Sequence, residues 1–293
     1  MYDFLFVYYR LSPAKLEEWH PGIGTALEAD DLPKAFSEKY YVHSGNRVEL
    51  NLLAIDSATH GRITFALRLA KAVTERPPKF GCFGLHEWAM VYSAGDSNDI
   101  RHGERLPLRL SQEETNAIVR SRPITCSHYD AFRFFTPEAK PLNRIQPTKD
   151  TRIDLEQCGC LHTNMDLYRW AGECMPWVGS DLLWDCFQLA VRARQLDMQA
   201  SPYDCRSLGF APICIETAEG RAEYEQEQRA IHEAAIPLRQ RLIQQLEIAM
   251  GKAHREAHSE QKIVLRRCLP LEDRAKLFAK GQRIGVIENP TVA

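Results

Sequence analysis

The feature that most constrains the fold is helical periodicity through much of the second half of this 293-residue chain. From residue 161 onward, apolar residues recur three or four positions apart, which is the spacing of one helix face. The pattern predicts helices over about 162–174, 180–200 and 217–258, the last opened by Thr217. Helices of this kind bury their apolar stripes against one another, so we expect a mainly α fold.

The first eighty residues predict shorter elements around one β-hairpin. Two strand-like runs flank a turn at residues 44–46, and the second run alternates strictly between apolar and polar positions, so we expect a hairpin near 40–54. Ser12, followed by a proline, begins a short helix. Helical spacing over 63–75 must end before Pro77.

The middle of the chain, between 77 and 160, is predicted to be irregular, except for a short helix opened by the capping box of Ser111 and Glu114. Long irregular segments inside a compact domain are uncommon and usually functional. We expect a single domain, 1–293, with three portions: a helix-and-hairpin portion (1–80), a motif-bearing core (81–216), and a long helix with a tail (217–293).

Composition and charge argue against several classes of protein. The net charge of −2 lacks the basic excess that proteins binding duplex DNA usually carry. The nine cysteines are scattered and form no Cys-x-x-Cys repeat, which is typical of buried thiols in a reducing compartment. No apolar run is long enough to span a membrane, and the first nine residues lack the basic start of a signal peptide. We therefore expect a cytoplasmic protein without a membrane partner.

His162 and Asp166 lie four residues apart, on one face of a predicted helix that Arg169 and Glu173 continue. This spacing lets an imidazole and a carboxylate bind one metal ion, or lets the carboxylate orient the imidazole. The alternative is a solvated polar face with an ordinary contact between histidine and aspartate.

Two further histidines interrupt apolar stretches. His86 and Glu87 lie within 83–92, where neighbouring residues point in different directions, so we expect them to serve different surfaces unless a loop gathers them. The alternative is a core histidine beside an exposed glutamate. His128 lies in the aromatic segment 126–135, a mixture that lines pockets for flat ligands and also fills ordinary cores.

Asp181 and Asp185 form a second pair at a spacing of four residues. Paired carboxylates suit metal binding or acid–base chemistry. Leu182, Leu189 and Leu196 already form an apolar stripe on the same predicted helix. The alternative is therefore that both aspartates face solvent, with Asp181 favourably placed at the helix N-terminus.

Several longer motifs together resemble a bacterial family that occurs notably in actinobacteria. Its members are commonly labelled 3-methyladenine DNA glycosylase. The motifs are Trp19-His-Pro-Gly, Leu85-His-Glu-Trp-Ala-Met-Val-Tyr92, the segments 126–135 and 159–170, and the segment 197–204. The resemblance covers about residues 2–245. It implies hydrolysis of the N-glycosidic bond of an alkylated purine in DNA.

On this first hypothesis, a flipped base stacks on aromatic side chains while a carboxylate activates water and a histidine exchanges the proton. The catalytic candidates are Glu87, His128, His162 and Asp166. The substrate-binding candidates are Trp88, Tyr92, Phe134, Asn164 and Trp170.

The second hypothesis is a metal-dependent enzyme that acts on a small molecule within a helical bundle. The candidate ligands, a set suited to iron, manganese or zinc, are His86, Glu87, His128, His162, Asp166, Asp181 and Asp185. A third hypothesis is a helical protein that binds a ligand without catalysis. The sequence leaves the substrate, the metal and the oligomeric state open.

The two enzymatic hypotheses share one geometric expectation. Three separate buried histidines would each need a partner of their own, whereas one shared cavity satisfies them together. We therefore predict that three groups of side chains line one pocket: His86 or Glu87, His128, and His162 or Asp166.

Overall fold

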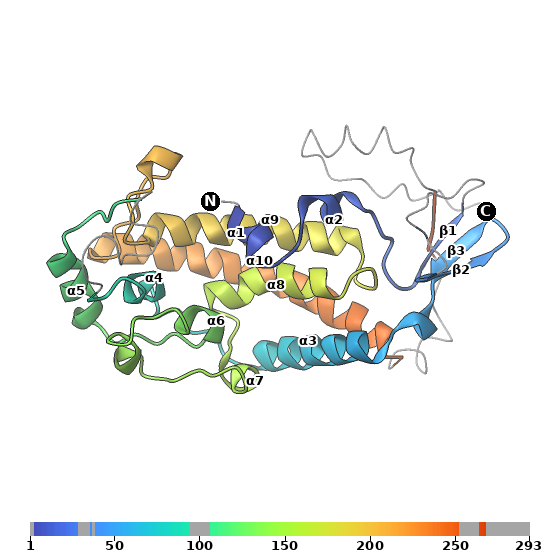
Figure 1. Ribbon diagram of the computed structural model, residues 1–293, viewed down its shortest axis with the longest axis horizontal. Coiled ribbons are helices and arrows are strands. Elements are labelled where there is room, and N and C mark those ends of the chain that lie inside the picture. Colours follow the sequence, from blue (N-terminus) through green and yellow to red (C-terminus); the bar gives the residue numbers. More distant parts are fainter. Residues whose placement is uncertain (1–2, 29–35, 37–38, 94–105, 252–263, 268–293) are drawn as a thin grey trace.

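The computed structural model describes residues 3–28, 36, 39–93, 106–251 and 264–267. These residues form an elongated bundle of helices with a small sheet at one end (Figure 1). The prediction of a mainly α fold is confirmed. Within the described ranges, none of the helices is both long enough and apolar enough to cross a membrane.

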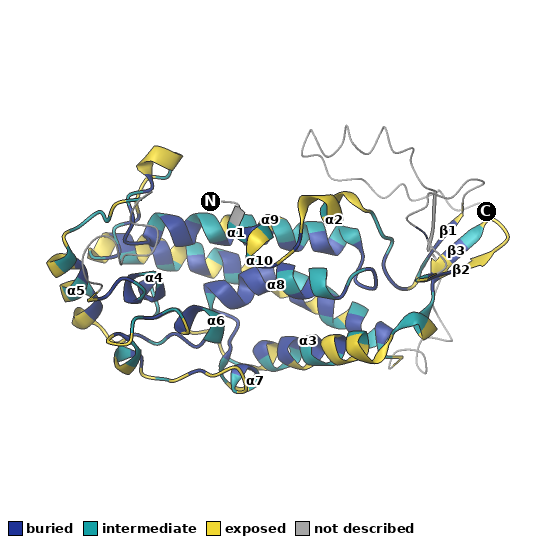
Figure 2. Cartoon of the chain, in the orientation of Figure 1, coloured by how far each residue is buried: buried dark blue, intermediate teal, exposed yellow. Residues whose placement is uncertain are grey.

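Four long helices build the bundle: α3 (Ser57–Glu75), α8 (Leu161–Glu173), α9 (Ser180–Ala200) and α10 (Ala218–Ala249). Helix α8 packs against both α9 and α10, and α10 also packs against α3. Ten of the 13 residues of α8 are buried, which makes it the central helix of the bundle (Figure 2). Side chains on almost every face of α8 therefore meet protein rather than solvent.

The predicted helices are present, with differences at their ends. Helix α10 begins after the N-cap Thr217 as predicted, and at 32 residues it is the longest helix of the described chain. Pro237 lies inside α10 and is exposed. The predicted end near 258 falls outside the described residues. Helix α3 begins earlier than expected because Asp56 caps it, accepting a hydrogen bond from the Thr59 amide at 2.7 Å.

The sheet contains the predicted hairpin and two strands that were not predicted. The hairpin pairs β2 (Tyr41–Ser44) with β3 (Arg47–Leu50), and a short 3-10 helix follows at Leu52–Ala54. Strand β1 (Thr25–Glu28) pairs with β3 in antiparallel orientation, and β4 (Val264–Arg267) lies parallel to β1. The strand order is β2-β3-β1-β4.

Short helices and loops cover the side of the bundle that carries the sequence motifs (Figure 1). They are α4 (Leu85–Ala89), α5 (Gln112–Ser121), α6 (Tyr129–Phe132) and α7 (Arg152–Leu155), with a 3-10 turn at Lys140–Leu142. A further 3-10 turn, at Arg206–Leu208, follows α9. The N-terminal residues add α1 (Asp3–Val7) and α2 (Pro13–Glu17). The predicted capping box opens α5, and that helix extends over ten residues.

Candidate functional site

Three segments that are far apart in the sequence bring their histidines together inside the bundle. His86 lies in α4, His128 immediately precedes α6, and His162 lies in the first turn of α8. The ring centroid of His162 is 4.5 Å from that of His86 and 5.4 Å from that of His128. All three residues are buried. The site has two halves, and His162 contacts a histidine in each.

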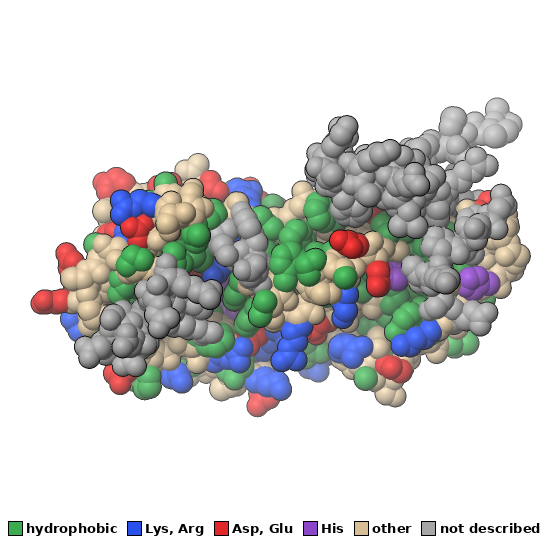
Figure 3. Space-filling model, turned by 45° about the horizontal axis from the view of Figure 1, so that its top comes forward, with side chains coloured by type: hydrophobic (Ala, Val, Ile, Leu, Met, Phe, Trp, Pro, Cys, Tyr) green, Lys and Arg blue, Asp and Glu red, His purple; other side chains and the backbone are tan. Residues whose placement is uncertain are grey.

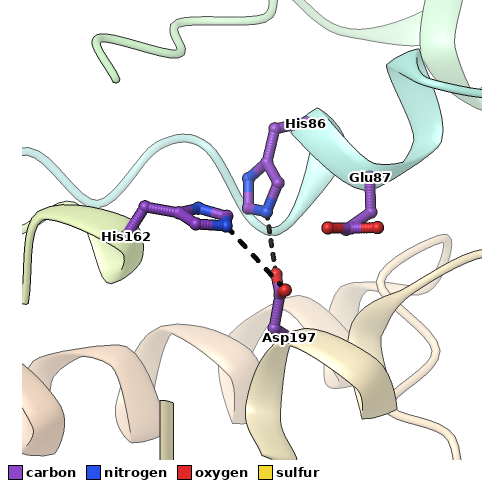
Figure 4. Close-up of side chains that lie close together, drawn as sticks. All are labelled: His86, Glu87, His162 and Asp197. Carbon is purple, nitrogen blue, oxygen red and sulfur yellow. Dashed lines mark hydrogen bonds and ion pairs between the residues drawn. The ribbon is translucent and has the colours of Figure 1, made fainter. Parts of the chain in front are cut away.

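The first cluster consists of His86, Glu87, His162 and Asp197, contributed by α4, α8 and α9 (Figure 4). One potential ligand atom from each residue lies within 4.8 Å of the corresponding atoms of the other three. Nε2 of His86 is 2.8 Å from Oδ1 of Asp197, and Nε2 of His162 is 3.9 Å from Oδ2 of the same carboxylate. The expectation that His86 and Glu87 serve different surfaces is wrong, because the one-turn helix α4 directs both toward α8 and α9.

The approach to α4 explains how these two residues reach the bundle. The chain enters α4 through two left-handed residues, Phe83 at φ 48° and Gly84 at φ 74°. A Cβ atom at position 84 would lie 3.3 Å from Cβ of Ala200 and 3.4 Å from the ring of Tyr224. Glycine therefore permits both the turn and the close approach of α4 to α9 and α10.

The second cluster consists of His128, Glu156 and Asp166. Nε2 of His128 is 3.1 Å from Oδ2 of Asp166 and 3.9 Å from Oε1 of Glu156. The Arg152 guanidinium donates to Glu156 at 2.8 Å and to Asp166 at 3.2 Å. The hydroxyl of Tyr9 donates to the other oxygen of Asp166 at 2.9 Å. The Asp166 carboxylate is thus held from three directions.

The expected partnership of His162 with Asp166 is wrong. Asp166 binds His128, whereas His162 faces Asp197. The elements packed around α8 decide this, because Asp197 comes from α9 and His128 from the residue before α6. The alternative of a solvated face is also wrong, because both residues are buried within the bundle.

Asp181 and Asp185 lie outside both clusters. Asp181 accepts a hydrogen bond from the Trp19 indole at 3.4 Å, and Asp185 accepts one from Arg241 at 2.6 Å. Twelve residues separate Asp185 from Asp197, which corresponds to about 18 Å along α9. The metal-ligand prediction for these two aspartates is therefore wrong, since only Asp197 on this helix reaches the first cluster.

The aromatic candidates for base stacking are mostly packed into the core. Trp88 is completely buried, and its indole donates to the carbonyl of Ala200 at 2.9 Å. Tyr92 and Trp170 are also buried. The ring of Phe134 is partly buried, and Cζ of the Arg133 guanidinium lies over it, 4.4 Å from the centroid of the Phe134 ring. The structure thus packs Trp88, Tyr92 and Trp170 as core residues rather than as the wall of an open cleft.

Burial and neighbouring charges set the charge states of the first cluster. Burial, together with the His86 ring, lowers the pKa of His162 to about 3, so this imidazole is neutral. Burial, together with the Asp197 charge, raises the pKa of Glu87 to about 7. Burial alone would also raise the pKa of Asp197, but His162, His86 and Arg194 hold it below its usual range. Burial would lower the pKa of His86, but the Cys82 thiol and Asp197 outweigh it and hold that pKa well above its usual value. The cluster thus pairs a protonated His86 with an ionised Asp197 and keeps His162 as a neutral imidazole, and a bound cation would take the place of the His86 proton.

Asp197 and Glu156 were not among the predicted site residues. Asp197 follows Cys186, Leu189 and Ala193 on the buried stripe of α9, and a carboxylate on an apolar stripe is a signal that could have identified it. Glu156 ends α7 and is completely buried. Its partner Arg152 lies four residues earlier, a spacing that also occurs on solvated helix faces, so the sequence alone does not mark Glu156 as buried.

Comparisons with known proteins do not assign the chain to a family. No family model, curated protein or solved structure matches it. The resemblance to proteins labelled 3-methyladenine DNA glycosylase therefore stays a prediction, and the function has to be inferred from the two clusters.

Proposed function

We propose that this protein is a metal-dependent enzyme that acts on a small molecule, with a divalent transition metal held by the first cluster. The distance between His162 and Asp197 carries the proposal. Ligand atoms about 2.1 Å from one metal ion are about 3.0–4.2 Å apart. The 3.9 Å between Nε2 of His162 and Oδ2 of Asp197 falls in that range and is too long for a hydrogen bond.

The donor set and its surroundings support the same conclusion. Two imidazoles and two carboxylates form a nitrogen-and-oxygen set that suits iron, manganese or zinc. Ligand side chains in metal sites are usually oriented by further hydrogen bonds. Here the Cys82 sulfur lies 3.4 Å from Nδ1 of His86, and Arg194 donates to Asp197 at 2.5 Å.

The carboxylates of the second cluster are already paired with a positively charged side chain, that of Arg152. Arg152 contacts Asp130, Glu156 and Asp166, each within 3.2 Å. In the first cluster, Arg194 binds Asp197 but lies 3.8 Å from Glu87. Uncompensated charge is unfavourable in a protein interior. Arg194 is within hydrogen-bonding distance of only one carboxylate of the first cluster, so Glu87 is the more weakly paired carboxylate and the better one for an added cation.

Each half of the site has a distinct role in the proposed chemistry. A metal ion in the first cluster would polarise a bound oxygen atom or lower the pKa of bound water. His128, oriented by Asp166, would exchange protons beside it, because its ring packs on that of His162. Side chains of both clusters are at most 13% exposed, which favours a substrate small enough to enter a closed site.

The surface supports a small-molecule substrate over duplex DNA. Acidic and basic side chains are interspersed on the face shown in Figure 3, and the chain has a net charge of −2. Duplex binding usually depends on a basic surface that neutralises phosphates. All eight described cysteines are free thiols, which supports the proposed cytoplasmic location.

Elemental analysis of protein purified without a metal-binding tag tests the proposal. We expect near-stoichiometric iron, manganese or zinc in the wild type. The substitutions His162→Ala and Asp197→Asn should remove most of the metal, because each deletes a ligand. Asp185→Asn is the matched control on the same helix and should retain the metal, since Asp185 pairs with Arg241 instead.

A metal-free wild type that also fails to bind added iron, manganese or zinc would refute the proposal. Equal metal content in the wild type and in Asp197→Asn would refute this choice of ligands. Release of 3-methyladenine from alkylated DNA by chelator-treated protein would instead favour the N-glycosylase that the resemblance implies.

A further inference from the structure

Two tyrosine hydroxyl groups are enclosed in the bundle without a hydrogen-bond partner among the described residues. They belong to Tyr168 on α8 and Tyr224 on α10, and both side chains are completely buried. Buried hydroxyl groups in proteins are nearly always hydrogen-bonded. A hydroxyl of this kind is available to a partner other than the surrounding side chains, such as a water molecule or a bound ligand.

The ring of Tyr224 lies against the start of the helix that carries His86 and Glu87. A Cβ atom built on Gly84 would be 3.4 Å from Cε2 and 3.7 Å from Cζ of this ring. Cζ carries the hydroxyl group, and Gly84 is the N-cap of α4. The hydroxyl end of Tyr224 therefore packs against the start of α4, the helix that carries His86 and Glu87 of the first cluster.

The charges around the two hydroxyl groups differ. Burial raises the pKa of both phenols. After burial, the Cys82 thiol, the Asp197 carboxylate, the Cys160 thiol and the Glu87 carboxylate raise the pKa of Tyr224 further, in that order, whereas burial is the sole cause at Tyr168. Tyr224 thus lies within the electric field of the first cluster and stays protonated, so its hydroxyl remains a hydrogen-bond donor at neutral pH.

Arg194 supplies a second donor at the same cluster. One of its terminal nitrogens binds Asp197, while its Nε atom is buried and has no partner among the described residues. An N–H group can only donate. The group that satisfies it is therefore an acceptor.

We infer that Tyr224 is a further ligand-binding residue, whose hydroxyl donates a hydrogen bond to a small anion bound at the cation of the first cluster. This inference rests on the proposed function, and it names the class of ligand as small anions with an acceptor atom beside the metal. Arg194, through Nε, is a second donor to the same ligand.

Azide binding to the cobalt(II)-loaded protein tests the inference, because a small anion at cobalt changes its visible absorption. Losing one hydrogen bond to an anion should weaken binding about tenfold. We therefore expect Tyr224→Phe to bind one cobalt ion as the wild type does and to have an azide Kd about tenfold higher. Tyr168→Phe is the matched control, and its azide Kd should equal that of the wild type.

Thermal unfolding of the three proteins separates this effect from damage to the fold. Both phenylalanine variants lose only a buried hydroxyl, so they should be at least as stable as the wild type. Unchanged azide affinity in Tyr224→Phe, or a wild-type cobalt protein that binds no azide, would overturn the inference alone. A wild type that binds no cobalt would overturn the proposed function and this inference together.

Discussion

At the residue scale, a buried charge in this bundle has a specific partner, as Arg239 of α10 illustrates. Its guanidinium is buried and donates to the side-chain oxygen of Asn164 on α8. The Asn164 amide donates in turn to the carbonyl of Cys158 at 2.9 Å. Asn164 was expected to contact substrate, but these contacts give it a structural role between two helices.

We predict that Asn164→Ala lowers the free energy of unfolding by about 1–3 kcal/mol, because it leaves a buried guanidinium without its acceptor. Asn164→Asp should lose less, since a carboxylate replaces the acceptor and adds a charge. Urea denaturation measures both effects. If Asn164→Ala kept the stability of the wild type and bound azide more weakly in the cobalt-loaded form, Asn164 would be a ligand-binding residue and not a structural one.

At the scale of single elements, a serine at the N-cap position makes a capping hydrogen bond in one helix and none in another. Ser111 opens α5, accepting a hydrogen bond from the amide of Glu114 at 3.2 Å. Ser12 occupies the N-cap position of α2, but its side chain makes no capping hydrogen bond. The sequence predicts a helix start at both serines, and only the structure distinguishes them.

We therefore predict that Ser111→Ala destabilises the protein by about 1 kcal/mol, the usual value of a capping hydrogen bond. Ser12→Ala is the matched control and should change the free energy of unfolding much less. Denaturant titrations of the two variants, with unchanged m values, provide the comparison. If Ser111→Ala and Ser12→Ala lowered the free energy of unfolding equally, the capping hydrogen bond of Ser111 would contribute nothing to stability.

At the scale of the whole molecule, the first cluster connects α4, α8 and α9. On the proposed function, a cation bound there would hold together segments separated by more than a hundred residues, and it would bind only when they are assembled. Binding that requires the folded state stabilises that state. Removal of the metal should therefore lower the stability of the whole bundle.

We predict that metal at about 100 times its Kd stabilises the protein by about 2.7 kcal/mol. For a domain of this size, that corresponds to a rise in Tm of roughly 4–6 °C, which a chelator should reverse. Differential scanning calorimetry with and without chelator measures it. In Asp197→Asn, metal and chelator should leave Tm unchanged, and a shift as large as in the wild type would place the metal elsewhere.

Local signals in the sequence determined most of the helical architecture. The apolar spacing of α8, α9 and α10 predicted these helices, because a helix needs one continuous face to bury. Capping residues and prolines marked several of the ends. The three histidine-bearing segments were also recognisable, since ionisable groups in apolar surroundings require partners. These signals act over a few residues and are readable without the fold.

Only the tertiary structure decided which partners those histidines have. His86 meets Asp197 across 111 residues of sequence, and His128 meets Asp166 across 38. Such pairs depend on how the helices cross and on which turn of each helix faces its neighbour. The parallel pairing of β4 with β1 depends on the same long-range packing. No local pattern encodes these contacts, because their energy exists only when distant segments are already side by side.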